Sequence, residues 1–294
     1  MTQRRANMGN RVTTVLARQL GSQLLAFREA VGLNQTRAAE VLSAQTAKVG
    51  KMEQGWVPFR DPDIIALCKL YGVDDDQVVQ GLLGLAKLDR ERRRVKGWWN
   101  VLDQGNLREY IAMEDVALKV RCWQISLIPG LFQTAEYIRA MAVSAILPDD
   151  IDGIERIVDV RLRRQARLHG DRALQVHAVI SEAALRQLMG GSGVMKRQLA
   201  QLRESTELPN VQVQVLPFRA SGYPGSGGPF NILSFAEEGA VDVVHMDGLG
   251  STAWVEGTEE SAIYASLFAR LCAVSLSPHD SAQLIEDIGK EMSA

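Results

Sequence analysis

Small, polar and positively charged side chains gather on a short segment between residues 45 and 51, which contains no aspartate or glutamate. Amide, hydroxyl and ammonium groups of this kind hydrogen-bond to base edges in the major groove of DNA, and small methyl-bearing side chains contact the thymine methyl group. The residues that could do this are Gln45, Thr46, Ala47, Lys48 and Lys51. Their chemistry favours contact with a DNA duplex.

Two short helices joined by a tight turn would position these side chains. The first helix is predicted over residues 35–42 and the second over 46–54, with a break at Ser43 and Ala44 and with Gly55 closing the second. Apolar residues recur at the i, i+3, i+4 spacing of one buried face; they are Ala38, Ala39, Leu42, Val49 and Met52. This arrangement is typical of a helix-turn-helix.

At these residues the chain resembles the DNA-binding domains of the phage-repressor-like (Xre/Cro) family. The matching strings are LNQ at 33–35, AAEVL at 38–42 and KVGKMEQG at 48–55, aligned without a gap. The resemblance implies that Gln35 contacts a phosphate from the start of the first helix, and that bases are read by Gln45, Thr46, Ala47 and Lys51. It also implies a structural ion pair between Arg28 and Glu53.

Two residues depart from the family pattern. Ser43 stands where the turn usually has a glycine in the left-handed conformation, which other residues adopt only at some cost. Gly50 lies inside the second helix, where glycine costs roughly 1 kcal/mol relative to alanine. Together they predict a recognition helix of modest rigidity.

Charge is distributed unevenly along the chain. Residues 1–60 hold nine basic and three acidic residues, a net charge of +6, whereas the rest holds 24 basic and 32 acidic residues, a net charge of −8. A basic N-terminal segment followed by an acidic remainder is typical of a protein that contacts phosphates through its N-terminal part. We assign phosphate contacts to basic residues that flank the second helix, Arg60 among them. The alternative is a chance imbalance between solvated faces.

The 294-residue length predicts two domains. We expect a disordered arm over 1–12, a five-helix helix-turn-helix domain over 13–86, a charged helical linker over 87–106 and an α+β domain over 107–294. The other helices of the first domain are predicted over about 14–31, 61–71 and 74–88. The linker is interpreted as a solvated helix, with a supplementary phosphate contact as the alternative.

The C-terminal domain shows both helical and strand periodicity. Helices are predicted over about 107–121, 134–145, 152–169, 182–189, 194–207, 258–274 and 278–291, and strands over 174–180, 211–217, 230–235, 241–246 and 252–256. The short spacings between the last strands favour an antiparallel sheet.

The C-terminal half is similar to a large actinomycete family in which an Xre-type domain precedes an antitoxin-like domain, as in WhiJ-type regulators. The similar strings are GWW at 97–99, LIPGLFQTAEY at 127–137, RLRRQARL at 161–168, PNVQVQVLPF at 209–218 and GYPGSGGPF at 222–230. The resemblance implies transcriptional regulation, often alongside a small cognate protein. We expect the C-terminal domain to control the regulator by sensing such a partner or a small-molecule effector. Because one helix-turn-helix makes few contacts, we also expect a homodimer on a pseudo-palindromic site, joined through the C-terminal domain or helices within 87–125.

Four residues of this half are candidates for partner or ligand binding. Arg161 and Arg164 form a row that could hold an anionic ligand or an acidic surface; a solvated face paired with Asp159 and Glu155 is the competing interpretation. Tyr223 lies in a Gly-rich loop that would be either a flexible connection or the lip of a pocket. His245 and Asp247 would share one strand face, as an acid–base or metal pair or as half-exposed residues.

Several classes of protein are disfavoured. The three cysteines are widely spaced in apolar segments, which predicts buried thiols in a reducing compartment. There is no apolar stretch after the N-terminal arginines and no run of ~20 apolar residues, so we expect a cytoplasmic protein without membrane contact. We predict no metal, no cofactor and no catalytic site. An antitoxin-type protein that mainly captures a partner is the leading alternative.

Overall fold

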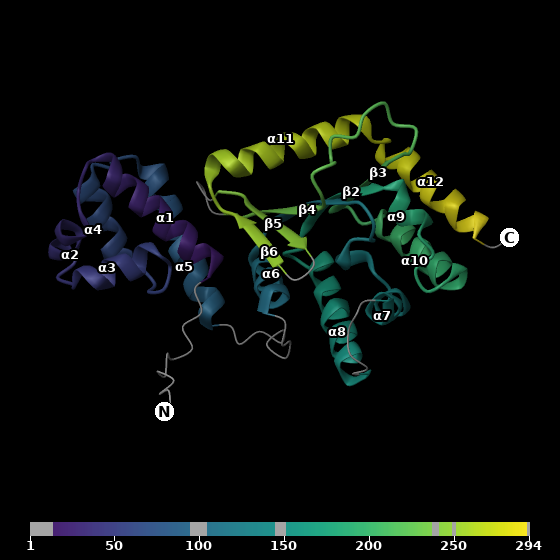
Figure 1. Ribbon diagram of the computed structural model, residues 1–294, viewed down its shortest axis with the longest axis horizontal. Helices are drawn as coiled ribbons and strands as arrows, with labels where there is room; N and C mark the ends of the chain where they lie inside the picture. Colours follow the sequence, from purple (N-terminus) through teal and green to yellow (C-terminus); the bar gives the residue numbers. More distant parts are fainter. Residues whose placement is uncertain (1–13, 95–104, 145–150, 237–240, 249–250, 293–294) are drawn as a thin grey trace, which may run out of the picture. The chain divides into compact units, whose positions relative to one another are not determined.

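The computed structural model describes residues 14–94, 105–144, 151–236, 241–248 and 251–292 (Figure 1). The chain forms two compact units, one containing the described residues 14–94 and the other the described residues from 105 onward. The predicted arm over 1–12 and the GWW string at 97–99 lie outside the described residues. The charged segment that begins at residue 87 continues the last helix of the first unit as far as Arg94.

The first unit consists of five helices, as predicted. They are α1 (Val15–Ala30), α2 (Gln35–Val41), α3 (Thr46–Glu53), α4 (Asp61–Tyr71) and α5 (Asp76–Arg94). Side chains cap helix N-termini in this unit: the Thr14 hydroxyl accepts from the backbone of Ala17 at α1, and Asn34 accepts from Arg37 at α2. Helix α1 packs against α3, α4 and α5 around a buried apolar core.

The turn between α2 and α3 takes the conformation expected at Ser43. Its φ of 47° makes it the single non-glycine residue with positive φ in the described part of the chain. The backbone N–H of Ala44 donates to the carbonyl of Ala39 at 2.9 Å, which closes the end of α2. A serine therefore holds a conformation that normally favours glycine.

The second unit combines helices with one sheet, which confirms the α+β prediction. Its helices are α6 (Gly105–Val116), η2 (Gly130–Phe132), α7 (Ala135–Ser144), α8 (Ile151–Arg164), η3 (Gln165–Leu168), α9 (Glu182–Arg186), α10 (Ser192–Ser205), α11 (Thr258–Val274) and α12 (Pro278–Glu291). Its strands are β1 (Lys119–Gln124), β2 (Gln175–Ser181), β3 (Val211–Leu216), β4 (Phe230–Ser234), β5 (Val243–Gly248) and β6 (Ser251–Val255). The predicted helix over 152–169 ends as an α-helix at Arg164 and finishes as a 3-10 turn.

The sheet is mixed, with strand order β3-β2-β1-β4-β5-β6. The pairs β1–β4, β4–β5 and β5–β6 are antiparallel, as the short connections predict, but β1–β2 and β2–β3 are parallel. The predicted antiparallel pairing therefore holds for the last strands, whereas the sheet as a whole is mixed. The reason is that α7 and α8 connect β1 to β2, and α9 and α10 connect β2 to β3, so each connection is long enough for the parallel crossover.

Strand β1 replaces part of a predicted helix. The expected helix over 107–121 stops at Val116, and Lys119 begins a strand that pairs on both sides, with β2 and with β4. Local periodicity favours a helix there, but pairing at the centre of the sheet outweighs it.

Different helices cover the two faces of the sheet. Figure 1 shows α11 along one face and α6 and α8 beside the other. Trp123, Val179 and Phe230 pack with Phe268 and Leu271 of α11 in one apolar cluster. Because strand residues alternate between faces, the neighbouring Cys122 points to the side of α6 and α8, where the pocket described below lies.

Within the described residues, no single helix has the length and apolar character needed to cross a membrane; α11 and α12 reach that threshold only as a pair bent by 68°.

Candidate functional site

The outward face of α3 displays the five residues predicted to read bases. Gln45, Thr46, Ala47, Lys48 and Lys51 are all exposed, and Gln45 precedes the helix in an extended conformation. In the described part of the chain, neither Lys48 nor Lys51 has a carboxylate within ion-pair distance. Their charges are therefore available to a polyanion.

A buried ion pair anchors α3 to α1. Arg28 donates from Nε to Oε1 of Glu53 at 2.6 Å and from Nη2 to Oε2 at 3.2 Å. Both side chains are buried, and the hydrogen bond to Glu53 raises the pKa of the Arg28 guanidinium. The pair implied by the family resemblance is thus present, and it fixes the end of the helix that carries the exposed lysines.

Gln35 is half-buried and belongs to the same network. Its side-chain amide donates to Oε2 of Glu53 at 2.7 Å. A Cβ placed on Gly50 would lie 3.3 Å from Oε1 of Gln35, so the glycine makes room for this amide. The phosphate contact assigned to Gln35 remains a prediction.

Gly21 sets how closely α1 approaches α3. A Cβ on Gly21 would lie 2.3 Å from the backbone oxygen of Glu53 and 2.8 Å from that of Met52. No side chain fits there without moving one of the helices, so the two backbones are in direct contact at this point.

Arg60 is the N-cap residue of α4. Its guanidinium donates from Nε and Nη2 to Asp63 at 3.0 and 2.9 Å, while the backbone N–H of Arg60 also donates to that carboxylate. Burial alone would raise the pKa of Asp63, but the hydrogen bonds from Arg60 lower it. The Arg60 side chain is exposed, so a phosphate contact would be made by a group that already has a partner.

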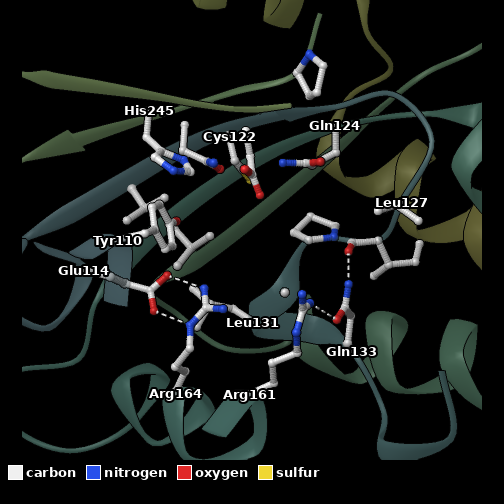
Figure 2. Close-up of a pocket in the computed structure, with 18 of the residues that line it drawn as sticks. Tyr110, Glu114, Cys122, Gln124, Leu127, Leu131, Gln133, Arg161, Arg164 and His245 are labelled. Atoms are coloured by element: carbon white, nitrogen blue, oxygen red, sulfur yellow. Dashed lines mark hydrogen bonds and ion pairs between the residues drawn. The ribbon is translucent and has the colours of Figure 1, made fainter. Parts of the chain in front are cut away.

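The second unit contains a cavity of about 310 Å³ beneath the sheet (Figure 2). Its walls come from α6, the loop leading into η2, α8, and the sheet face formed by β1, β2, β4 and β5. Figure 2 shows Arg161 and Arg164 extending from α8 toward this space, with His245 and Tyr110 across it. The structure therefore brings together three of the four candidate residues of the C-terminal half.

Arg164 is buried and forms an ion pair. Its Nε and Nη2 each donate to a different oxygen of Glu114 at 2.8 Å, and its guanidinium carbon lies 5.3 Å from the ring centroid of Tyr110. The interpretation of a solvated arginine face is wrong for Arg164. Its charge is neutralised by Glu114 on α6, which lies fifty positions earlier in the chain.

Arg161 has only a neutral partner. Its Nη1 donates to Oε1 of Gln133 at 2.6 Å, and Gln133 donates to the carbonyl of Ile128 at 2.7 Å. In the described residues, its Nε is buried without a partner and no carboxylate lies within ion-pair distance. Burial and the nearby Arg164 lower the pKa of Arg161 to about 10, so it remains a cation at neutral pH.

His245 is buried, contrary to the half-exposed interpretation, with 5% of its surface exposed. Its ring lies 4.6 Å from the ring of Tyr110 and 4.6 Å from that of Trp254, and its Nδ1 has no partner among the described residues. Burial and Arg164 lower its pKa to about 4, so the imidazole is neutral at neutral pH. Asp247 lines the same cavity but is exposed, which bears out the shared strand face.

Cys122 and Tyr110 line the cavity without being activated. Burial raises the pKa of the Cys122 thiol to about 12 and that of the Tyr110 hydroxyl well above its usual value. Both groups are therefore protonated at neutral pH. Among the described residues, Arg161 has no carboxylate within ion-pair distance, although Asp247 lines the same cavity.

Tyr223 is exposed and is not among the residues that line this cavity. Its ring meets that of Trp123 edge-on, with centroids 5.9 Å apart, and the Trp123 indole donates to the carbonyl of Gly225 at 3.1 Å. The Gly-rich loop is thus anchored to the tryptophan that faces α11.

Sequence reasoning missed several lining residues, among them Tyr110, Glu114, Cys122 and Gln133. The only signal was the string LIPGLFQ at 127–133, which supplies much of one wall. In the described part of the chain, no group of three or more histidine, cysteine, aspartate or glutamate residues is placed to hold a metal ion.

Comparison with known proteins separates the same two regions. Residues 19–80 match the family described as "Helix-turn-helix domain", which supports a DNA-binding regulator. No curated protein and no solved structure showed significant similarity. Residues 107–287, more than half of the sequence, match the family described as "Domain of unknown function (DUF5753)", and the chain therefore belongs to that family, with a helix-turn-helix domain preceding the family domain.

Proposed function

We propose that the protein is a sequence-specific transcriptional regulator of the Xre type, acting in the cytoplasm. In this proposal α3 enters the major groove, Thr46 and Lys51 contact base edges, and Gln35 and Arg60 contact phosphates. The observation that carries the proposal is the exposed face of α3, whose lysines have no carboxylate partner among the described residues. Exposed cations of this kind gain free energy by releasing counterions from DNA.

Double substitution of Thr46→Ala and Lys51→Ala tests base reading. Sites would be selected from random duplexes with the wild-type protein, and binding to the selected and scrambled sites compared at one salt concentration. The variant should fold normally, because both side chains are exposed, and should lose roughly 1–3 kcal/mol of discrimination for each contact.

Lys69→Ala is the matched control. Lys69 is exposed on α4, so its loss removes one charge from the same unit without touching α3. The control should keep the ratio of selected to scrambled binding. A double variant with an unchanged ratio would refute the assignment of base reading to α3.

We further propose that two copies bind together on a pseudo-palindrome, with half-sites about 34 Å apart. Selected sites should then show two-fold symmetry, and sedimentation of the complex should give two chains per duplex. A single chain on an asymmetric site would contradict this part of the proposal.

We assign control of DNA binding to the C-terminal domain, which would sense a small-molecule effector or a small cognate protein. The cavity beneath the sheet supports the small-molecule form, because two buried nitrogens of its lining residues, Nε of Arg161 and Nδ1 of His245, have no hydrogen-bond partner among the described residues. Footprinting with and without candidate effectors tests this control.

A further inference from the structure

The cavity beneath the sheet has the properties of a preformed ligand site. Its volume of about 310 Å³ is at the lower end of the range for small-molecule pockets. Apolar groups such as Tyr110, Ile128 and Leu131 line it together with the polar side chains of Arg161 and His245. The walls belong to helices and a sheet as well as to the loop before η2.

The charged side chains that line the cavity are two arginines and two carboxylates, Glu114 and Asp247, but in the described residues only Arg164 has a carboxylate within ion-pair distance. Glu114 neutralises Arg164 through two hydrogen bonds of 2.8 Å. Arg161, three residues earlier on the same face of α8, has only the neutral Gln133 as a hydrogen-bond partner in the described chain. Asp247 attracts Arg161 electrostatically, but it is exposed and lies beyond ion-pair distance. Because a desolvated cation is costly without a close counter-charge, the site would gain free energy from a negative charge brought next to Arg161.

A second unsatisfied group lies across the cavity. Nδ1 of His245 is buried without a hydrogen-bond partner among the described residues, and the imidazole is neutral at neutral pH. An unmade hydrogen bond at a buried polar atom is unfavourable. A ligand that spans from Arg161 to His245 would satisfy both groups.

We propose that this cavity binds a small molecule with a single carboxylate group and a compact apolar body. Arg161 holds the carboxylate, the apolar body lies against Tyr110, and a polar group at the far end hydrogen-bonds to Nδ1 of His245. A single charge is specified because Arg164 already has its counter-charge, so a phosphate dianion would bring one charge in excess. This inference names the effector class for the sensing role proposed above, and rests on that role only for its effect on DNA binding.

Paired acids and amides test the charge requirement directly. The full chain, free of DNA, would be titrated by calorimetry with benzoate and benzamide, phenylacetate and phenylacetamide, and hexanoate and hexanamide, with phenylphosphonate as the dianionic probe. At least one acid should bind about 10-fold or more tighter than its amide, a ratio that corresponds to about 1.4 kcal/mol and to the lower end of a hydrogen bond to a charged group.

Arg161→Gln should abolish the preference for the acid, and Arg161→Lys should retain part of it. Arg163→Gln is the matched control, because Arg163 is exposed on the same helix and pairs with Asp159. The control should bind like the wild-type protein. Two results with the wild-type protein would overturn the inference: equal binding of acid and amide in every pair, or tighter binding of phenylphosphonate than of every carboxylate. Both results can be read without the variants, so they hold even if a variant fails to fold.

Affinity for the selected DNA site, measured with and without the best acid, separates this inference from the proposed function. A tenfold change supports both. Acid binding with unchanged DNA affinity retains the carboxylate site and refutes sensing through it. Specific DNA binding without any acid preference retains the regulator and refutes the carboxylate site.

Discussion

The basic residues of the two units are used in opposite ways. On α3 the lysines are exposed, and in the described chain they have no carboxylate partner. On α8, Arg161 and Arg164 extend toward the cavity, and one of them is neutralised by Glu114. An exposed charge is stabilised by water whether or not a partner arrives, whereas an enclosed charge needs a partner to be stable. The first arrangement suits a large polyanion that docks from outside, and the second suits a small anion that enters.

Both units nevertheless use the same device to hold their helices. Arg28 with Glu53 joins α1 to α3, and Arg164 with Glu114 joins α8 to α6, each through two hydrogen bonds. A buried pair of this kind orients the elements that it joins, while removal of one member leaves an uncompensated charge. The difference between the units therefore lies in what surrounds the pair: a solvent-exposed helix face in one, and in the other a cavity whose second arginine, Arg161, hydrogen-bonds to the neutral Gln133.

The largest effect that tests this comparison is expected from Glu114→Gln. Because Arg164 would remain buried without its counter-charge, the free energy of unfolding should fall by about 3–5 kcal/mol in urea denaturation. Asp159→Asn, which breaks the exposed pair with Arg163, should cost less than about 1 kcal/mol. Equal effects of the two substitutions would mean that the cavity is as well solvated as the helix surface.

His245 should make the stability of the second unit depend on pH. Its pKa is about 4 in the folded protein and about 6.5 in an unfolded chain, so between these values only the unfolded state binds the proton. Stability is complete above about pH 6.5 and is lost as the pH falls toward 4, by about 3 kcal/mol.

The variant His245→Asn should lack this part of the pH dependence. His177, whose pKa is also lowered by burial, contributes to both proteins, so the difference between them isolates His245. His279→Asn, at an exposed position, is the control and should follow the wild type. An unchanged pH profile in His245→Asn would show that the imidazole is not desolvated. Denaturant unfolding between pH 4 and 7.5 measures all three.

The smallest effect is expected at the turn before α3. Ser43 has a φ of 47°, so Ser43→Gly should remove the steric cost of the left-handed conformation and stabilise the first unit by about 0.5–1 kcal/mol. Ala44→Gly, in the same turn without a positive φ, should destabilise it instead. Thermal unfolding would detect both, and a destabilised Ser43→Gly would show that the turn is not strained.

Whether a structural feature could be predicted from the sequence depends on how far apart along the chain its interacting residues lie. The five helices of the first unit follow from local periodicity and capping, and the α2–α3 turn from a single residue. Strand β1 and the parallel pairs do not, because each parallel pair joins residues that lie 35 or 56 positions apart in the chain. The α+β class could be predicted because later strands are joined by short connections.

The candidate pocket was harder to predict than the helix-turn-helix. Arg161 and Arg164 could be singled out as a row, but nothing near them in the sequence indicated that Glu114 would neutralise one and leave the other with Gln133 alone. His245 was noted for its spacing from Asp247, while its burial against Tyr110 depends on α6. Residues on the exposed face of a single helix are predictable from spacing, whereas cavity residues come from segments that only the fold assembles.

The direct backbone contact at Gly21 limits how this protein could acquire a new target sequence. Since no side chain fits between α1 and the end of α3, the tilt of α3 on its scaffold is set by main-chain atoms that substitution does not alter. Related chains that keep this glycine should therefore diverge in operator preference by exchanging the outward side chains of α3, with its angle to the domain unchanged.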